Sequence, residues 1–298
     1  MKRLLRLGTA GIFLLGAGGA FAQTTTTTTV PGPGQCFNGG DPNNSCSGGC
    51  GSSSPTCAAD DPGCVPNTKD HLKCSDAIVK GFQKAIGCVS KCHCKQAANL
   101  LAGKPFNEET CEGHNPPKNN ACEDKLDGAF TKVTPLCSST QLTLAHAEES
   151  ALFAPKNVAP SFDAQNGNVF CDSTSGAMIM TSDPDDAGWK PNSKDMLKCE
   201  CTVAKNLSKL AVDALRCHIK LADAFFKGKP YDENSCEEVD PAKGKAALQK
   251  FTQAETVILG KNICPPCLDK PHQDALGAGV LAQVEAGNSL AYPCNEGP

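Results

Sequence analysis

Two Cys-His pairs, Cys92-His93 and Cys217-His218, are the residues of this chain best suited to chemistry. A cysteine followed by a histidine ends the c-type haem attachment motif, in which two thiols form thioethers and the imidazole binds iron. In the first pair the other thiol, Cys88, lies one residue too far away, and the second pair has no such thiol. We therefore expect no cofactor. The alternative is an electron-transfer protein that binds haem c or a metal at Cys92, His93, Cys217 and His218.

Ten basic residues recur at a spacing of 7, 4, 7 and 4 along two segments of the chain. On a helix this spacing keeps the side chains within a narrow arc, which we call the basic ridge. Such a ridge could bind an anionic polysaccharide or envelope surface, and a solvated helix face explains the same pattern. No aromatic residue interleaves the ridge, so stacking on nucleic acid is not expected. The ten positions are Lys73, Lys80, Lys84, Lys91, Lys95, Lys198, Lys205, Lys209, Arg216 and Lys220.

The remaining motifs give little support to enzymatic chemistry. Cys264-Pro265-Pro266-Cys267 has the C-x-x-C spacing of metal chelators and thiol redox sites, but no βαβ pattern surrounds it. The sequence contains no G-x-S-x-G, H-E-x-x-H or P-loop motif. We therefore expect a protein that is not an enzyme.

The N-terminus predicts export. Lys2, Arg3 and Arg6 precede a short apolar stretch that ends in Ala20-Phe21-Ala22, as in a cleavable signal peptide over residues 1–22. Loss of these three basic residues changes the formal net charge from −4 to −7, which disfavours nucleic-acid binding. No apolar run reaches 18 residues, so no transmembrane segment is expected. The 20 cysteines also indicate an oxidising compartment, secreted or periplasmic.

An internal duplication organises most of the chain. Residues 66–112 align without a gap to residues 191–237 at an offset of 125, and 19 of these 47 positions are identical. Outside the copies, a Thr/Gly/Pro-rich linker leads into an arm whose order must come from disulfides. We expect a signal peptide (1–22), a linker and cysteine-rich arm (23–65), copy one (66–171), a linker (172–190) and copy two (191–298).

Each copy predicts a helical hairpin followed by a short third helix. Thr68 and Ser193 are good N-caps, and Gly103 and Gly228, each followed by Lys-Pro, are clear stop signals. Apolar residues between these limits recur at helical spacing, and strand signals are scarce. The further helices are expected near 119–134, 140–153, 241–259 and 273–287. The fold class is therefore mainly α, with two tandem disulfide-stapled units and an irregular cysteine-rich arm.

Cysteine positions common to both copies predict disulfides within each hairpin. A hairpin brings the start of its first helix beside the end of its second, and cysteines that appear or vanish together in one copy suggest a bonded pair. These arguments predict Cys74–Cys137, Cys199–Cys264, Cys92–Cys111, Cys217–Cys236, Cys88–Cys122 and Cys201–Cys267. Among those left, Cys171–Cys294 and a bond from Cys94 to the N-terminal arm would balance the count.

The repeated order of Lys-Cys, spaced lysines, Lys/Arg-Cys-His-x-Lys-x-Ala, Gly-Lys-Pro and Cys-Glu resembles the Lys/Ala/Cys-rich helical repeats of uncharacterised secreted bacterial proteins. The likeness covers residues 66–137 and 191–264. It implies a secreted helical-repeat protein and carries no activity with it. We expect a non-enzymatic structural or binding protein, with an anionic polysaccharide or envelope surface as the partner the basic ridge would contact.

Overall fold

The computed structural model describes residues 30–37, 62–154, 161–179 and 186–296. The predicted signal peptide and most of the linker and cysteine-rich arm lie outside these residues. The described chain is mainly helical, and its β-structure is limited to two isolated bridges. The α-helices are α1 (Lys69–Leu101), α2 (Glu109–Glu112), α3 (Cys122–Val133), α4 (Ser139–Leu152), α5 (Phe162–Val169), α6 (Lys194–Phe226), α7 (Asn234–Glu237), α8 (Ala247–Leu259) and α9 (Lys270–Ala291).

The two longest helices, α1 and α6, begin and end at the signals expected from the sequence. Each has 33 residues and therefore spans about 50 Å. The Thr68 side chain accepts a hydrogen bond from the His71 amide, and Ser193 caps α6 in the same way. Gly103 and Gly228 follow with φ of 65° and 64°, a left-handed conformation that glycine adopts without steric cost. The caps therefore fix the length of both helices.

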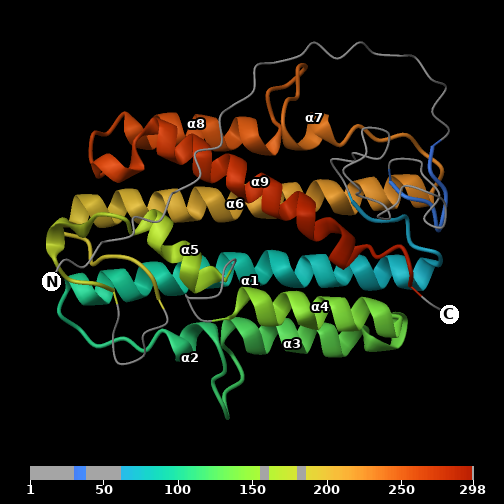
Figure 1. Ribbon diagram of the computed structural model, residues 1–298, viewed down its shortest axis with the longest axis horizontal. Helices are drawn as coiled ribbons and strands as arrows, with labels where there is room; N and C mark the ends of the chain where they lie inside the picture. Colours follow the sequence, from blue (N-terminus) through green and yellow to red (C-terminus); the bar gives the residue numbers. More distant parts are fainter. Residues whose placement is uncertain (1–29, 38–61, 155–160, 180–185, 297–298) are drawn as a thin grey trace, which may run out of the picture.

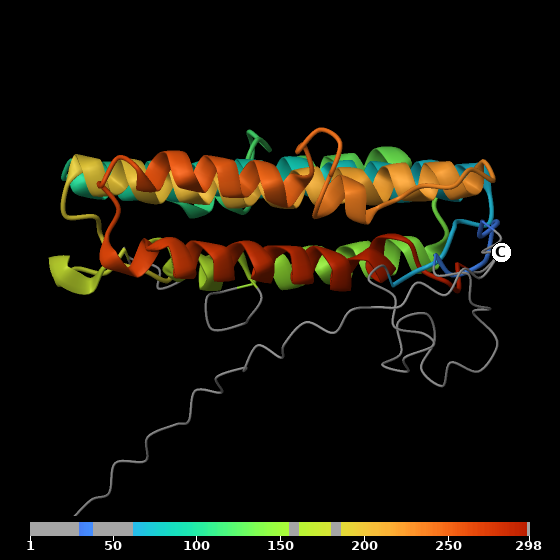
Figure 2. The ribbon, with the colours of Figure 1, turned by 90° about the horizontal axis from the view of Figure 1, so that it is seen from above.

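The helices form two layers. In Figure 1, α8, α6, α1 and α3 lie side by side, with α1 and α6 antiparallel at the centre. Figure 2 shows the second layer, in which α9 and the shorter α4 and α5 run beneath the first. Buried apolar side chains on α1, including Ile78 and Phe82, pack against Leu126 and Phe130 of α3. The long contact of α1 with α6 joins the two copies into one helical body.

Five predicted disulfides are present, and each of them joins two cysteines of the same copy. Two link the start of a long helix to the end of its hairpin, two link α1 and α6 to the short helices α2 and α7, and one links α1 to the start of α3. The bonds are Cys74–Cys137, Cys199–Cys264, Cys92–Cys111, Cys217–Cys236 and Cys88–Cys122. No cysteine in the described ranges is a free thiol.

The other predicted pairings are wrong. Cys201 bonds to Cys94 and not to Cys267, which bonds instead to Cys171. Cys294 bonds to Cys64 and not to Cys171. The prediction treated each copy as a closed unit, whereas antiparallel packing places the C-terminal part of α1 beside the N-terminal part of α6. Two of the remaining bonds, Cys94–Cys201 and Cys171–Cys267, therefore join the two copies. The third, Cys64–Cys294, joins the cysteine-rich arm to copy two.

None of the described helices is long and apolar enough to cross a membrane.

Candidate metal centres

The first centre surrounds His93, which projects from α1 and is 6% exposed. Four carboxylates converge on its Nε2 atom from separate elements: α2, the residue preceding α2, α5 and the segment before α6. The distances from Nε2 are 3.0 Å to Glu112, 3.2 Å to Asp186, 3.7 Å to Asp163 and 4.0 Å to Glu108. All four carboxylate residues are buried. One imidazole therefore faces four acidic groups in a site that bulk water barely reaches.

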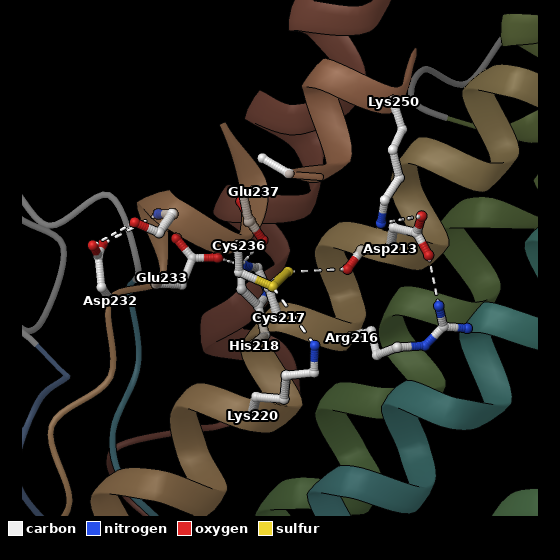
Figure 3. Close-up of a disulfide and its surroundings, with 12 residues drawn as sticks. Asp213, Arg216, Cys217, His218, Lys220, Asp232, Glu233, Cys236, Glu237 and Lys250 are labelled. Carbon is white, nitrogen blue, oxygen red and sulfur yellow. Dashed lines mark hydrogen bonds and ion pairs between the residues drawn. A yellow bond between two sulfur atoms is a disulfide. The ribbon is translucent and has the colours of Figure 1, made fainter. Parts of the chain in front are cut away.

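The second centre surrounds His218 on α6, which is 1% exposed. Its Nε2 atom lies 3.2 Å from Glu237, 3.5 Å from Glu285 and 3.8 Å from Glu233. Figure 3 shows Glu233 and Glu237 next to His218 and the Cys217–Cys236 disulfide. Glu285 comes from α9 in the other layer. This site has the same core composition as the first, one histidine and several glutamates.

The two centres use equivalent positions of the two copies. His93 and His218 differ by the repeat offset of 125, and so do the glutamate pairs Glu108/Glu233 and Glu112/Glu237. The remaining ligand candidates differ, because α5 supplies Asp163 where α9 supplies Glu285, and Asp186 belongs to the first centre alone. A shared core of one His and two Glu is thus completed differently in each copy.

Local structure explains how each core is held. The glutamates of a pair are four residues apart across a one-turn helix, so both face the same side. A disulfide ties that short helix to the long one, and its cysteines are sequence neighbours of the ligand candidates: Cys92 precedes His93, and Cys111 precedes Glu112. The bond Cys217–Cys236 does the same in copy two. These disulfides hold each histidine next to the two glutamates of its copy.

The pKa values of the first centre reflect burial and crowding of acidic groups. Burial, with the neighbouring Glu112, raises the pKa of Glu108 to about 10. Burial likewise raises the pKa of Asp163 to about 6, against the opposing influence of His93. For His93 burial acts to lower the pKa, but the surrounding carboxylates outweigh it and the pKa lies well above the usual value. The cluster thus retains protons that a bound cation could displace.

The second centre shows the same competition for positive charge. Burial raises the pKa of Glu285 to about 9, with further upward shifts from Glu237. Burial also acts to raise the pKa of Glu237, but its interactions with His218, Glu285 and Glu233 lower it to about 2. One glutamate of this centre is therefore held ionised while another retains its proton.

Several of the converging atoms lack a hydrogen-bond partner of good geometry among the described residues. In the first centre they are His93 Nε2, Glu108 Oε1, Glu112 Oε2 and Asp186 Oδ1, and in the second they include Glu237 Oε1 and Glu285 Oε2. Buried polar atoms normally have a partner, because leaving one unpaired costs about 1–3 kcal/mol. A single ring N–H cannot serve the four carboxylates around His93 or the three around His218, so hydrogen bonding alone does not account for either cluster.

No family model, curated protein or solved structure matches this chain.

The structure places the predicted site residues in two different roles. His93 and His218 lie at the centres described above, whereas Cys92 and Cys217 are in disulfides, so their sulfur atoms cannot form the thioethers of haem c. The sequence motifs pointed to cysteine and histidine as ligands and not to the glutamates. A signal was available: both glutamate pairs are among the identical positions of the two copies, alongside the histidines.

The basic ridge lies apart from this chemistry. All ten of its residues are exposed on α1 and α6. Three of them pair with acidic residues one turn away: Lys73 with Asp70, Lys80 with Asp76 and Arg216 with Asp213. These pairs partly neutralise the ridge, and the other seven residues leave it cationic.

Proposed function

We propose that this chain is a secreted metal-binding protein with two buried sites, one per copy, for divalent first-row transition metals. The observation that carries the proposal is the convergence of three or four carboxylates on one histidine in each copy, with the histidine and two of the glutamates at equivalent positions. His93, Glu108, Glu112, Asp163 and Asp186 would hold one ion. His218, Glu233, Glu237 and Glu285 would hold the other.

Charge supports the proposal first. With Glu108 holding its proton, at most three carboxylates face the protonated His93, and the first cluster then carries a formal charge of −2. Buried charges are costly unless they are paired or coordinate a metal. A divalent cation would neutralise most of that charge and displace the retained protons.

Geometry and ligand type support it further. Metal–ligand distances of about 2.0–2.2 Å place donor atoms of one ion roughly 3–4 Å apart. The contacts around His93 and His218 span 3.0–4.0 Å and 3.2–3.8 Å. Imidazole nitrogen is a ligand for zinc, iron, copper and nickel, whereas magnesium and calcium prefer oxygen alone. The mixed donor set therefore favours a transition metal, and disulfide bonding leaves no thiolate at either site.

Export and surface binding complete the proposal. The cleavable leader expected from residues 1–22 would deliver the chain to an oxidising compartment, which agrees with the disulfides of the described residues.

A second candidate function is attachment to an anionic polysaccharide or envelope surface. The exposure of all ten ridge residues favours it.

The test is metal stoichiometry of the full disulfide-bonded chain. Bound metal is removed from the protein with a chelator, and samples are incubated separately with zinc, manganese and iron(II). After desalting, the metal content is measured by inductively coupled plasma mass spectrometry. We expect two ions per chain, one in H93A, one in H218A and none in the double variant. H146A is the matched control, because His146 is an exposed histidine on α4 and should leave both ions bound. A wild-type metal content no higher than that of the double variant, with every metal tried, would refute the proposal.

A further inference from the structure

A large cavity lies between the two helical layers. Its volume is about 710 Å³, and its walls come from α1 and α6 on one side and from α4, α5 and α9 on the other. Figure 2 shows these two layers edge-on. Small-molecule sites typically occupy about 300–1,000 Å³. The volume between the layers is therefore that of a ligand site rather than a packing defect.

The cavity walls are mostly apolar, and the one cationic side chain among them, His93, is paired with the carboxylates of the first metal centre. Its walls include Phe82, Val89, Leu207, Val280, Val284 and Leu290, and no lysine or arginine lines it. The titratable lining residues are His93 and Glu148, and burial raises the pKa of Glu148. Exposed amide side chains, Asn168 and Gln283, also contribute to the lining. Such walls suit a hydrophobic molecule with an uncharged polar end, and they disfavour an anionic one.

Covalent bonds prevent the layers from collapsing onto each other. Helix α9 is anchored just before its start, where Cys267 bonds to Cys171 and Cys264 bonds to Cys199 of α6. It is anchored again just after its end, where Cys294 bonds to Cys64. A helix fixed at both ends cannot shift sideways to fill the space beneath it. The cavity is thus preformed, which lowers the cost of ordering a bound molecule.

The face of α9 that lines the cavity is built from small residues. Gly279 and Gly287 both line it, and a Cβ atom added at either position would meet no atom within 4 Å. Ala275 and Ala286 lie on the same wall. Glycine inside a helix costs about 0.5–1 kcal/mol relative to alanine, so these residues maintain space at the expense of helix stability.

We propose that the cavity binds one uncharged, elongated apolar molecule of the class of isoprenoids and long-chain alcohols. The chain of the ligand lies along the apolar walls of α1, α6 and α9. Its hydroxyl or carbonyl end contacts the amide groups of Asn168 and Gln283. The cavity adjoins the first metal centre, because His93 contributes both to that centre and to a cavity wall.

The experiment uses the full disulfide-bonded chain in chelator and the neutral fluorescent probe N-phenyl-1-naphthylamine. We expect saturable fluorescence enhancement at one probe per chain. We also expect displacement by farnesol but not by ionised palmitate at equal concentration. Chelator in the buffer makes the result independent of the metal proposal.

Cavity-filling variants decide where the probe binds. Replacement of either glycine by leucine, G279L or G287L, should lower probe affinity by at least about tenfold, because the new side chain occupies the site. Both variants should fold, since leucine favours a helix more than glycine does. G128L is the matched control: Gly128 lies in α3, does not line the cavity, and also has open space beside it. Absence of saturable binding, unchanged affinity in both filled variants, or equal displacement by palmitate would each overturn the proposal.

Discussion

Replacing one ligand glutamate by glutamine should change stability in opposite directions with and without metal. Glu112 lies 3.0 Å from His93 Nε2, among three further carboxylates. Without metal, E112Q removes one of several mutually repelling acidic groups, and we expect a gain of about 1 kcal/mol. For a chain of this size, that gain raises Tm by about 2–4 °C. With metal, the same change removes a ligand.

The loss in the presence of metal follows from binding linkage. At a free ion concentration of roughly 100 times Kd, one site stabilises the folded state by about 2.7 kcal/mol. That stabilisation corresponds to a rise in Tm of about 5–10 °C per site. We expect E112Q to lose this rise at the first centre while the second centre keeps its own. E237Q should do the reverse.

The assay is differential scanning calorimetry of the wild-type chain and each variant, in chelator and in excess zinc. E238Q is the matched control, because Glu238 is exposed beside the second centre and should not alter either Tm. A purely structural His93–Glu112 ion pair would make E112Q less stable in both buffers. Such a result, or a wild-type Tm that does not respond to chelator, would refute the reasoning.

Two further predictions concern Glu200 and the basic ridge. Glu200 is fully buried with no hydrogen-bond partner for either carboxylate oxygen within the described chain, and burial, assisted by Asp172, raises its pKa to about 8. The native carboxyl group therefore holds its proton more tightly than the unfolded one, so stability should fall as pH rises from about 4.5 to about 8. E200Q should remove this fall, a difference of a few kcal/mol between pH 5 and pH 8.5 in urea titrations, and parallel pH profiles would contradict it. For the ridge, the wild-type chain should bind a heparin column at low salt, and K84Q with K209Q should elute earlier, whereas K125Q with K132Q on α3 should not; no retention of the wild type would count against the surface function.

Local signals in the sequence predicted the long helices well. Thr68 and Ser193 cap α1 and α6 as expected, and the helices end before Gly103 and Gly228. The hairpin disulfides could be predicted because they depend only on contacts inside one copy. Helix α5 was not expected, because eight residues carry too little periodicity to detect.

Long-range packing could not be read from the same signals. The bond between Cys94 and Cys201 depends on which face of α1 meets α6, and intrahelical spacing does not determine that. In the candidate centres too, some residues could be predicted from the sequence and others could not. Their His and Glu core could have been found from identity between the copies, whereas Asp163, Asp186 and Glu285 reach it only through the packing of α5, the segment before α6 and α9.

The bond between Cys64 and Cys294 imposes an order on biosynthesis. Export from the N-terminus, as proposed above, would deliver Cys64 to the oxidising compartment 230 residues before its partner. During that interval most cysteines of copy one can close their own bonds, but Cys64, Cys94 and Cys171 must wait for copy two. These three thiols are then open to wrong pairing with other cysteines. We therefore expect recombinant production without a disulfide isomerase to give scrambled species.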